Sequence, residues 1–124
     1  MKNILIIDDE EDIRFSLKEL LKLHNYNTIE APSAEKAMIL LKKEKVDLLL
    51  LDMQLPEMNG LEFVQEIRKE NKELPVIIMT AFHAIEGVVE MMEEEVQGFI
   101  KKPFGIEEVL MKIEKFVGRN MNES

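Results

Sequence analysis

The sequence predicts an α/β protein with a doubly wound, five-stranded parallel sheet and five helices. Along its 124 residues, short apolar runs alternate five times with longer amphipathic stretches. The three strongest runs, residues 4–7, 46–51 and 76–79, are apolar throughout except for Asp47, which is typical of strands buried on both faces. Because parallel neighbours need a crossover, strict alternation predicts helices on both faces of the sheet.

The first half of the chain predicts two strand and helix pairs. Strand 4–7 is followed by a helix over residues 13–24, because apolar residues recur there at helical spacing. Residues 27–31 form a weaker strand. Ser33 is placed to cap the second helix, whose apolar face comprises Ala37, Leu40 and Leu41.

The second half predicts three more pairs. Strand 46–51 is followed by a helix that opens at Gly60, and strand 76–79 by a fourth helix with an apolar stripe from Ile85 to Met92. Residues 96–100 supply a last, short strand. A fifth helix closes the fold, with its apolar face formed by Val109, Ile113, Phe116 and Val117.

Composition limits the class of protein. With 124 residues and 46% apolar residues, the chain is sized for one domain. Its net charge of -9 disfavours direct binding to nucleic acid or an anionic membrane, and it has no cysteine for disulfides or thiolate metal sites. The first apolar run stops at Asp8, too early for a signal or membrane segment. We therefore expect a cytoplasmic protein.

Acidic residues follow two strands that would be neighbours in such a sheet. Asp8 and Asp9 follow the first strand, and Asp52 ends the third. Three carboxylates at one edge repel one another, and a hard cation such as Mg²⁺ would relieve that repulsion. The alternative for Asp8 and Asp9 is an ordinary acidic first turn of the following helix.

A hydroxyl and an ammonium group join the same edge. Thr80 follows the fourth strand and Lys102 the fifth. Each residue alone is explained by an ordinary structural role. Thr80 could make a local hydrogen bond at a strand end, and Lys102 could be a solvated cation. Together with Asp52 and a cation they supply what phosphoryl transfer to aspartate requires, namely a nucleophile, positioning groups and charge neutralisation.

Five segments carry a resemblance to a known family. The chain resembles the receiver domain of two-component response regulators, a flavodoxin-like (βα)5 fold, over essentially its whole length. The matching segments are Ile6-Ile7-Asp8-Asp9, Leu50-Leu51-Asp52-Met53-Gln54, Leu55-Pro56-Glu57-Met58-Asn59-Gly60, Met79-Thr80-Ala81 and Lys102-Pro103-Phe104. The resemblance implies a receiver domain over residues 1–118 and a C-terminal tail over residues 119–124.

The resemblance implies a phosphoacceptor and a metal site. Asp52 would accept a phosphoryl group from a sensor histidine kinase or a histidine phosphotransfer protein. Asp9, Asp52 and the backbone carbonyl of Gln54 would ligate Mg²⁺, with Asp8 acting mainly through water.

It further implies roles around the phosphoryl group. Thr80 and Lys102 would hold phosphoryl oxygens, and Lys102 is preferred to Lys101 because the family lysine immediately precedes the proline. The Lys102-Pro103 bond is expected to be cis. Gln54 and Phe82 would tune the lifetime of the acyl phosphate.

The implied output is a signalling surface on the fourth helix, the fifth strand and the fifth helix, with Phe99 as an aromatic switch or simply a packed strand residue. That surface would contact a downstream protein or an output domain, or form a homodimer on phosphorylation. The protein would catalyse only its own phosphorylation and slow dephosphorylation. Whether it stands alone or is a module of a larger regulator is left open.

Two other functions fit this sequence less well. A phosphatase or phosphotransferase with an aspartyl-phosphate intermediate would need a second carboxylate two residues after the nucleophile, where Gln54 stands. A binding module that keeps only the fold is disfavoured by the intact polar set, which comprises Asp8, Asp9, Asp52, Thr80 and Lys102.

Overall fold

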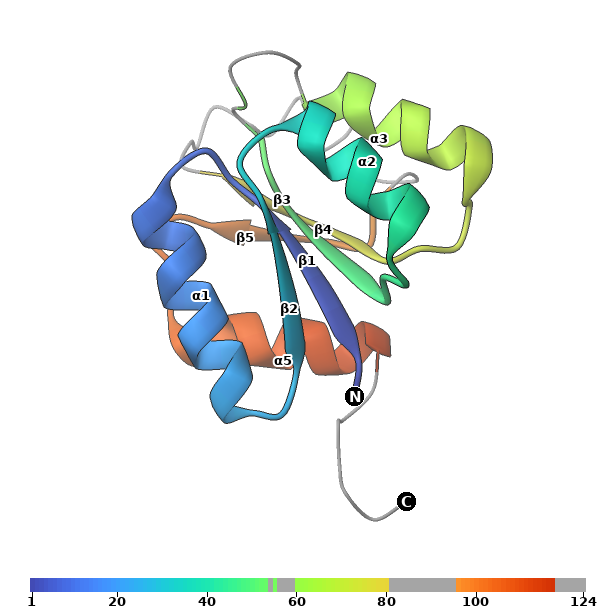
Figure 1. Ribbon diagram of the computed structural model, residues 1–124. Coiled ribbons are helices and arrows are strands. Elements are labelled where there is room, and N and C mark those ends of the chain that lie inside the picture. Colours follow the sequence, from blue (N-terminus) through green and yellow to red (C-terminus); the bar gives the residue numbers. More distant parts are fainter. Residues whose placement is uncertain (54, 56–59, 81–95, 118–124) are drawn as a thin grey trace.

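The computed structural model describes residues 1–53, 55, 60–80 and 96–117 (Figure 1). Five parallel strands form one sheet in the order β2-β1-β3-β4-β5. Their bounds are β1 Asn3–Ile7, β2 Asn27–Ala31, β3 Leu48–Asp52, β4 Val76–Thr80 and β5 Gly98–Lys101. The described helices are α1 Glu11–Leu23, α2 Ala34–Lys43, α3 Gly60–Glu70 and α5 Ile106–Val117. The predicted doubly wound parallel sheet is confirmed.

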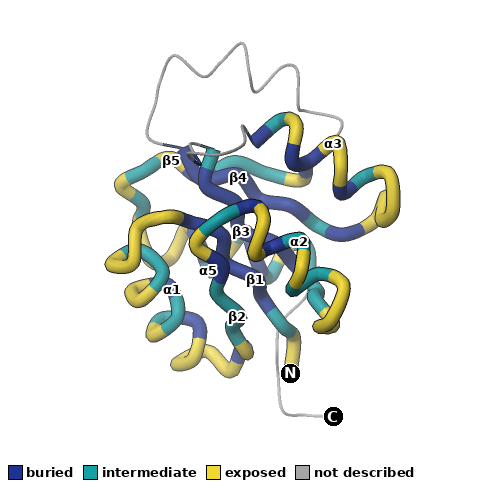
Figure 2. The backbone as a smooth tube through the Cα atoms, turned by 45° about the horizontal axis from the view of Figure 1, so that its top comes forward, coloured by how far each residue is buried: buried dark blue, intermediate teal, exposed yellow. Residues whose placement is uncertain are grey.

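The helices cover both faces of the sheet, with α1 and α5 on one side and α2 and α3 on the other (Figure 1). Successive strand residues point to opposite faces, so each strand contributes to two cores. Ile4 and Ile6 pack with α1 and α5, whereas Leu5 and Ile7 pack with α2 and α3. The central strands β1, β3 and β4 are therefore buried almost throughout, as Figure 2 shows.

The third strand begins two residues later than predicted, at Leu48 instead of residue 46. The predicted start was wrong because apolar character does not specify ladder pairing. The carboxylate of Asp47 accepts a hydrogen bond from the backbone N–H of Asn3 at 2.8 Å, so this residue caps the entry to the sheet.

The last strand is Gly98–Lys101 instead of residues 96–100. Val96 is buried in the core but precedes the strand, whose register starts with Ile77 opposite Gly98. The side chain of Gln97 accepts the backbone N–H of Val76 at 2.7 Å, which takes the place of a ladder bond.

Some predicted features lie outside the described residues. These are the fourth helix with its stripe from Ile85 to Met92, the positions Gln54 and Phe82, and the tail over residues 119–124. Within the part of the chain that the structure describes, no helix combines the length and apolar character needed to cross a membrane.

The sheet brings the carboxyl ends of β1, β3, β4 and β5 to one edge. Strand register pairs Ile7 with Leu51 and Thr80 with Lys101, so the residues that follow β1 and β5 emerge beside the ends of β3 and β4. In open parallel sheets this edge is where ligands bind.

Ser33 provides a test of the local fold. Its hydroxyl caps α2 by accepting the backbone N–H of Lys36 at 3.2 Å, as predicted. We expect Ser33→Ala to lower the free energy of unfolding by about 1 kcal/mol, measured by urea denaturation. Ser16→Ala, at an exposed position inside α1, is the control and should change it by less than about 0.5 kcal/mol. Equal stabilities of the two variants would contradict the capping role.

Candidate functional site

Three buried polar side chains gather at the carboxyl edge of the sheet. Asp8 is fully buried, and Asp52 and Thr80 are 5% and 4% exposed. They follow or end β1, β3 and β4, three adjacent strands. Asp9 is exposed beside them. The predicted convergence of Asp8, Asp52 and Thr80 at one edge is therefore observed.

Lys102 crosses this edge and joins the carboxylates. Its Nζ lies 2.9 Å from Asp8 Oδ2 and 3.6 Å from both Asp52 Oδ1 and Glu10 Oε1. The Lys102 side chain is 12% exposed, whereas the neighbouring Lys101 is exposed. Lys102 is therefore the lysine that contacts the buried carboxylates, and the Lys102-Pro103 bond is cis, as predicted.

The surroundings of Lys102 keep its ammonium group charged. Burial lowers the pKa of Lys102, but the hydrogen bond to Asp8 and the charges of Asp52, Asp8 and Glu10 raise it, and the net pKa lies above the ordinary value. A raised lysine pKa means that the ion pairs persist at neutral pH and are lost only in strongly alkaline solution.

Asp8 is held through each of its polar atoms. Its backbone N–H donates to the carbonyl of Ala31 at 3.1 Å, and its own carbonyl accepts Arg14 Nη1 at 2.7 Å. Its Oδ1 accepts the backbone N–H of Glu10 at 2.9 Å, while Oδ2 accepts Lys102. Such complete pairing offsets the free-energy cost of burying a carboxylate.

Asp8, Asp9 and Glu10 together offer oxygen ligands. One carboxylate oxygen from each lies within 4.8 Å of the others, a set of hard donors suited to Mg²⁺. Sequence reasoning missed Glu10, because an acidic residue at the start of a helix is commonplace. Of the other two predicted ligands, Asp52 does not belong to this cluster, and Gln54 lies outside the described residues.

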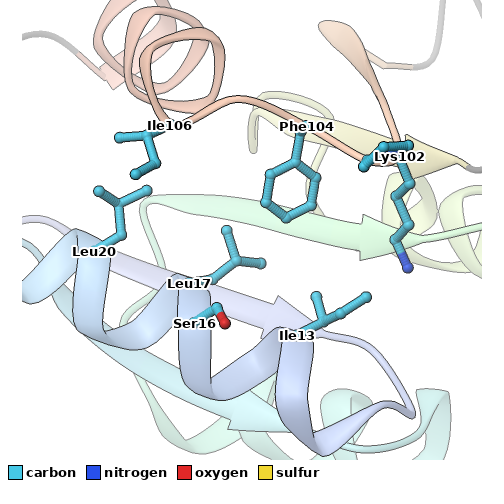
Figure 3. Close-up of a pocket in the computed structure, with 8 residues that line it drawn as sticks. Ile13, Ser16, Leu17, Leu20, Lys102, Phe104 and Ile106 are labelled. Carbon is cyan, nitrogen blue, oxygen red and sulfur yellow. The ribbon is translucent and has the colours of Figure 1, made fainter.

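A pocket of about 650 Å³ opens beside this cluster, between α1 and the segment that follows β5 (Figure 3). Phe104 points from that segment toward Ile13 and Leu17 of α1. Lys102 belongs to the same lining, so the pocket is continuous with the charged edge. The remaining lining is formed by Ser16, Leu20, Pro103 and Ile106.

The family model for the response regulator receiver domain matches residues 4–114. The chain belongs to this family. It is a receiver domain of two-component response regulators, and the resemblance inferred from its motifs is confirmed. The match covers all four strand ends that supply the buried edge.

The receiver domain is similar to proteins of about its own length and to segments of longer proteins. It is 33% identical to the sporulation initiation phosphotransferase F of Bacillus subtilis, with 98% of each chain covered. It is 38% identical to a cyclic di-GMP phosphodiesterase of Thermotoga maritima, of which it spans only 29%, while covering 89% of its own length.

Among solved structures, the receiver domain resembles the response regulator protein TrrA from Thermotoga maritima in complex with Mg(2+)-BeF. The TM-score is 0.85 at 33% identity, and the alignment covers 94% of this chain and 99% of that one.

Lys102 offers a test of how the edge is held. We expect Lys102→Met to lower the free energy of unfolding by about 2 kcal/mol, because it leaves two buried carboxylates without their shared cation. Lys101→Met is the matched control at an exposed neighbouring position and should change stability by less than about 0.5 kcal/mol. Chemical denaturation measures both, and equal effects would contradict the pairing as a source of stability.

Proposed function

We propose that this receiver domain takes a phosphoryl group from a phosphohistidine partner onto Asp52, in a reaction that requires Mg²⁺. The observation that carries the proposal is the placement of Asp52, which is 5% exposed at the carboxyl edge, 3.6 Å from the ammonium nitrogen of Lys102. A carboxylate beside a fixed cation, at the edge where parallel sheets bind ligands, is suited to act as a phosphoryl acceptor.

The proposed step conserves atoms and charge. A carboxylate oxygen of Asp52 attacks phosphorus, the P–N bond to the donor histidine breaks, and the leaving imidazole nitrogen keeps that electron pair. The imidazole leaves neutral when its other ring nitrogen carries a proton, and otherwise takes one proton from solvent. Lys102 neutralises charge on the phosphoryl oxygens, and the hydroxyl of Thr80, on the next strand, donates to one of them. The protein mainly positions groups and compensates charge.

The acidic residues that the structure describes at this edge support a bound Mg²⁺. Asp9, Asp52 and the backbone carbonyl of Gln54 would hold it, with Asp8 acting mainly through water. When bound, the ion neutralises the phosphoryl oxygens and the carboxylate cluster. The clustering of Asp8, Asp9 and Glu10 oxygens supports a cation there, as does the similarity to TrrA, whose structure contains Mg(2+)-BeF.

The phosphorylated protein itself would carry the signal, and no small-molecule product would be released from Asp52 in this step. We propose that the output surface comprises β5, α5 and the predicted fourth helix, which lies outside the described residues; Phe99 of β5 is partly buried against the core. Receiver domains act with histidine kinases or phosphotransfer proteins and with output domains. Several finer points remain predictions. These are a downstream protein target, a phosphorylation-dependent homodimer, a cytoplasmic location, a domain boundary at residues 1–118, and catalysis restricted to self-phosphorylation and slow dephosphorylation.

The acceptor assignment is tested by intact mass after incubation with Mg²⁺ and acetyl phosphate. We expect one phosphoryl adduct on the wild type, none on Asp52→Ala, and none when EDTA removes the metal. Asp47→Ala is the matched control, because Asp47 precedes the amino end of the same strand and bonds to Asn3 there. It should be phosphorylated like the wild type.

No adduct on a folded wild-type protein with any phosphodonor would reject the proposal and favour a binding module that keeps only the fold. An adduct that persists in Asp52→Ala would instead move the acceptor to another residue.

The apolar pocket beside Lys102 is suited to contact the phosphodonor protein, because that protein must cover the same edge to deliver its phosphohistidine. Ile106 lines the pocket and is 59% exposed, so its loss should spare the fold. We expect Ile106→Ser to slow transfer from a phosphohistidine protein about five- to tenfold, the effect of losing a central contact, and to leave acetyl phosphate labelling unchanged.

Met111→Ser is the control for that experiment. Met111 is 69% exposed on the same helix and is absent from the pocket lining. Rates measured by radiolabel transfer should match the wild type for this variant. Equal slowing with both donors, or no slowing by Ile106→Ser, would argue against the pocket as a docking surface.

A further inference from the structure

Arg14 makes two contacts that link the acidic edge to the sheet. It lies on α1, and its side chain is 14% exposed. Its Nη1 donates to the backbone carbonyl of Asp8 at 2.7 Å, and its Nε donates to Glu30 Oε1 at 3.2 Å. Glu30 belongs to β2, so one guanidinium group joins the helix, the loop after β1 and the neighbouring strand.

The contact with Asp8 falls where the main chain leaves the sheet. The ladder between β1 and β2 ends with the N–H of Asp8, which donates to Ala31. The next main-chain group, the Asp8 carbonyl, lies beyond the strand pairs and accepts a hydrogen bond from Arg14. Arg14 therefore continues the restraint on the backbone at the start of the segment that presents Asp8, Asp9 and Glu10.

We propose that Arg14 is a positioning residue for the metal and phosphoryl site. It fixes the loop that carries the acidic cluster by tying the carbonyl of Asp8 to Glu30 of β2. The inference rests on the proposed function for its consequence, Mg²⁺ binding, and on the geometry alone for the loop restraint.

The geometry requires an arginine and not only a positive charge. The planar guanidinium holds two donors in fixed directions, whereas a lysine ammonium is a single point of contact. Lys18, on the same helix as Arg14, supplies a natural comparison. Its Nζ lies 3.8 Å from Glu30 Oε2, and its side chain is 45% exposed. Among the contacts described, Lys18 reaches Glu30 and not Asp8.

The sign of the effect on Mg²⁺ binding separates positioning from simple electrostatics. Removing a cation close to an acidic cluster should strengthen the binding of a divalent cation, because one repulsive charge disappears. Releasing the loop should weaken binding, because the carboxylates lose their fixed geometry. Arg14→Ala therefore has opposite expected outcomes under the two explanations.

The experiment titrates Mg²⁺ into the full chain by calorimetry, comparing the wild type with Arg14→Ala, Arg14→Lys and Lys18→Ala. We expect Arg14→Ala to raise the dissociation constant on the order of tenfold, as for other residues that orient metal ligands. Arg14→Lys, which keeps the charge, should fall between it and the wild type. Lys18→Ala removes the same charge and should leave the constant unchanged or lower it.

A second readout needs no metal. The backbone N–H of Glu10 donates to Asp8 Oδ1, so its hydrogen exchange reports the order of the loop. In the metal-free protein we expect exchange of the Glu10 amide to accelerate at least severalfold in Arg14→Ala and to stay at the wild-type rate in Lys18→Ala. Amides in the core strand β3 serve as an internal control for global unfolding.

The outcomes distinguish the two proposals. Unchanged Glu10 exchange in Arg14→Ala, or Mg²⁺ binding as tight as in Lys18→Ala, would overturn the role of Arg14. A wild type that binds no Mg²⁺ would reject the proposed function, while Glu10 exchange would still decide the restraint. If Arg14→Ala fails to fold, Arg14→Lys decides, since wild-type values for both readouts would overturn the proposal.

Discussion

The structure depends on holding two carboxylates, Asp8 and Asp52, inside the same edge of the sheet. Burying like charges together is costly unless a cation and hydrogen bonds compensate for the lost water. Lys102 supplies the cation, 2.9 Å from one carboxylate and 3.6 Å from the other. It reaches them only because β1, β3, β4 and β5 are consecutive in the sheet and their carboxyl ends lie together. Strand order is thus what makes the charge balance possible.

The apolar layers keep this edge in place. Residues of β1, β3 and β4 are buried on both faces, and each alternate side chain packs into one of two cores. Close packing resists displacement, so the strand ends are fixed relative to one another and the polar residues beyond them inherit that rigidity. Functional side chains set on such rigid elements are placed more reliably than those on long loops.

Much of this arrangement was predictable from the sequence. Apolar runs identified β1, β3 and β4, and the rule that parallel strands end at one edge brought Asp8, Asp52 and Thr80 together. The starts of β3 and β5 were wrong because Val46 and Val96 are apolar without pairing in the ladder. Sequence spacing also cannot reveal that Glu10 and Arg14 contact Asp8, since both look like ordinary residues at the start of a helix.

Two cations hold Asp8 in different ways, and the difference matters for a switch. Lys102 binds its carboxylate, a contact that competes with any phosphoryl oxygen that Lys102 is proposed to hold. Arg14 binds its backbone carbonyl, which neither takes up a proton nor carries a net charge. Under the proposed function, the contacts of Lys102 are therefore the ones that a phosphoryl group would rearrange. The Arg14 contact can persist in both states, so the loop keeps its place while the charges around it are redistributed.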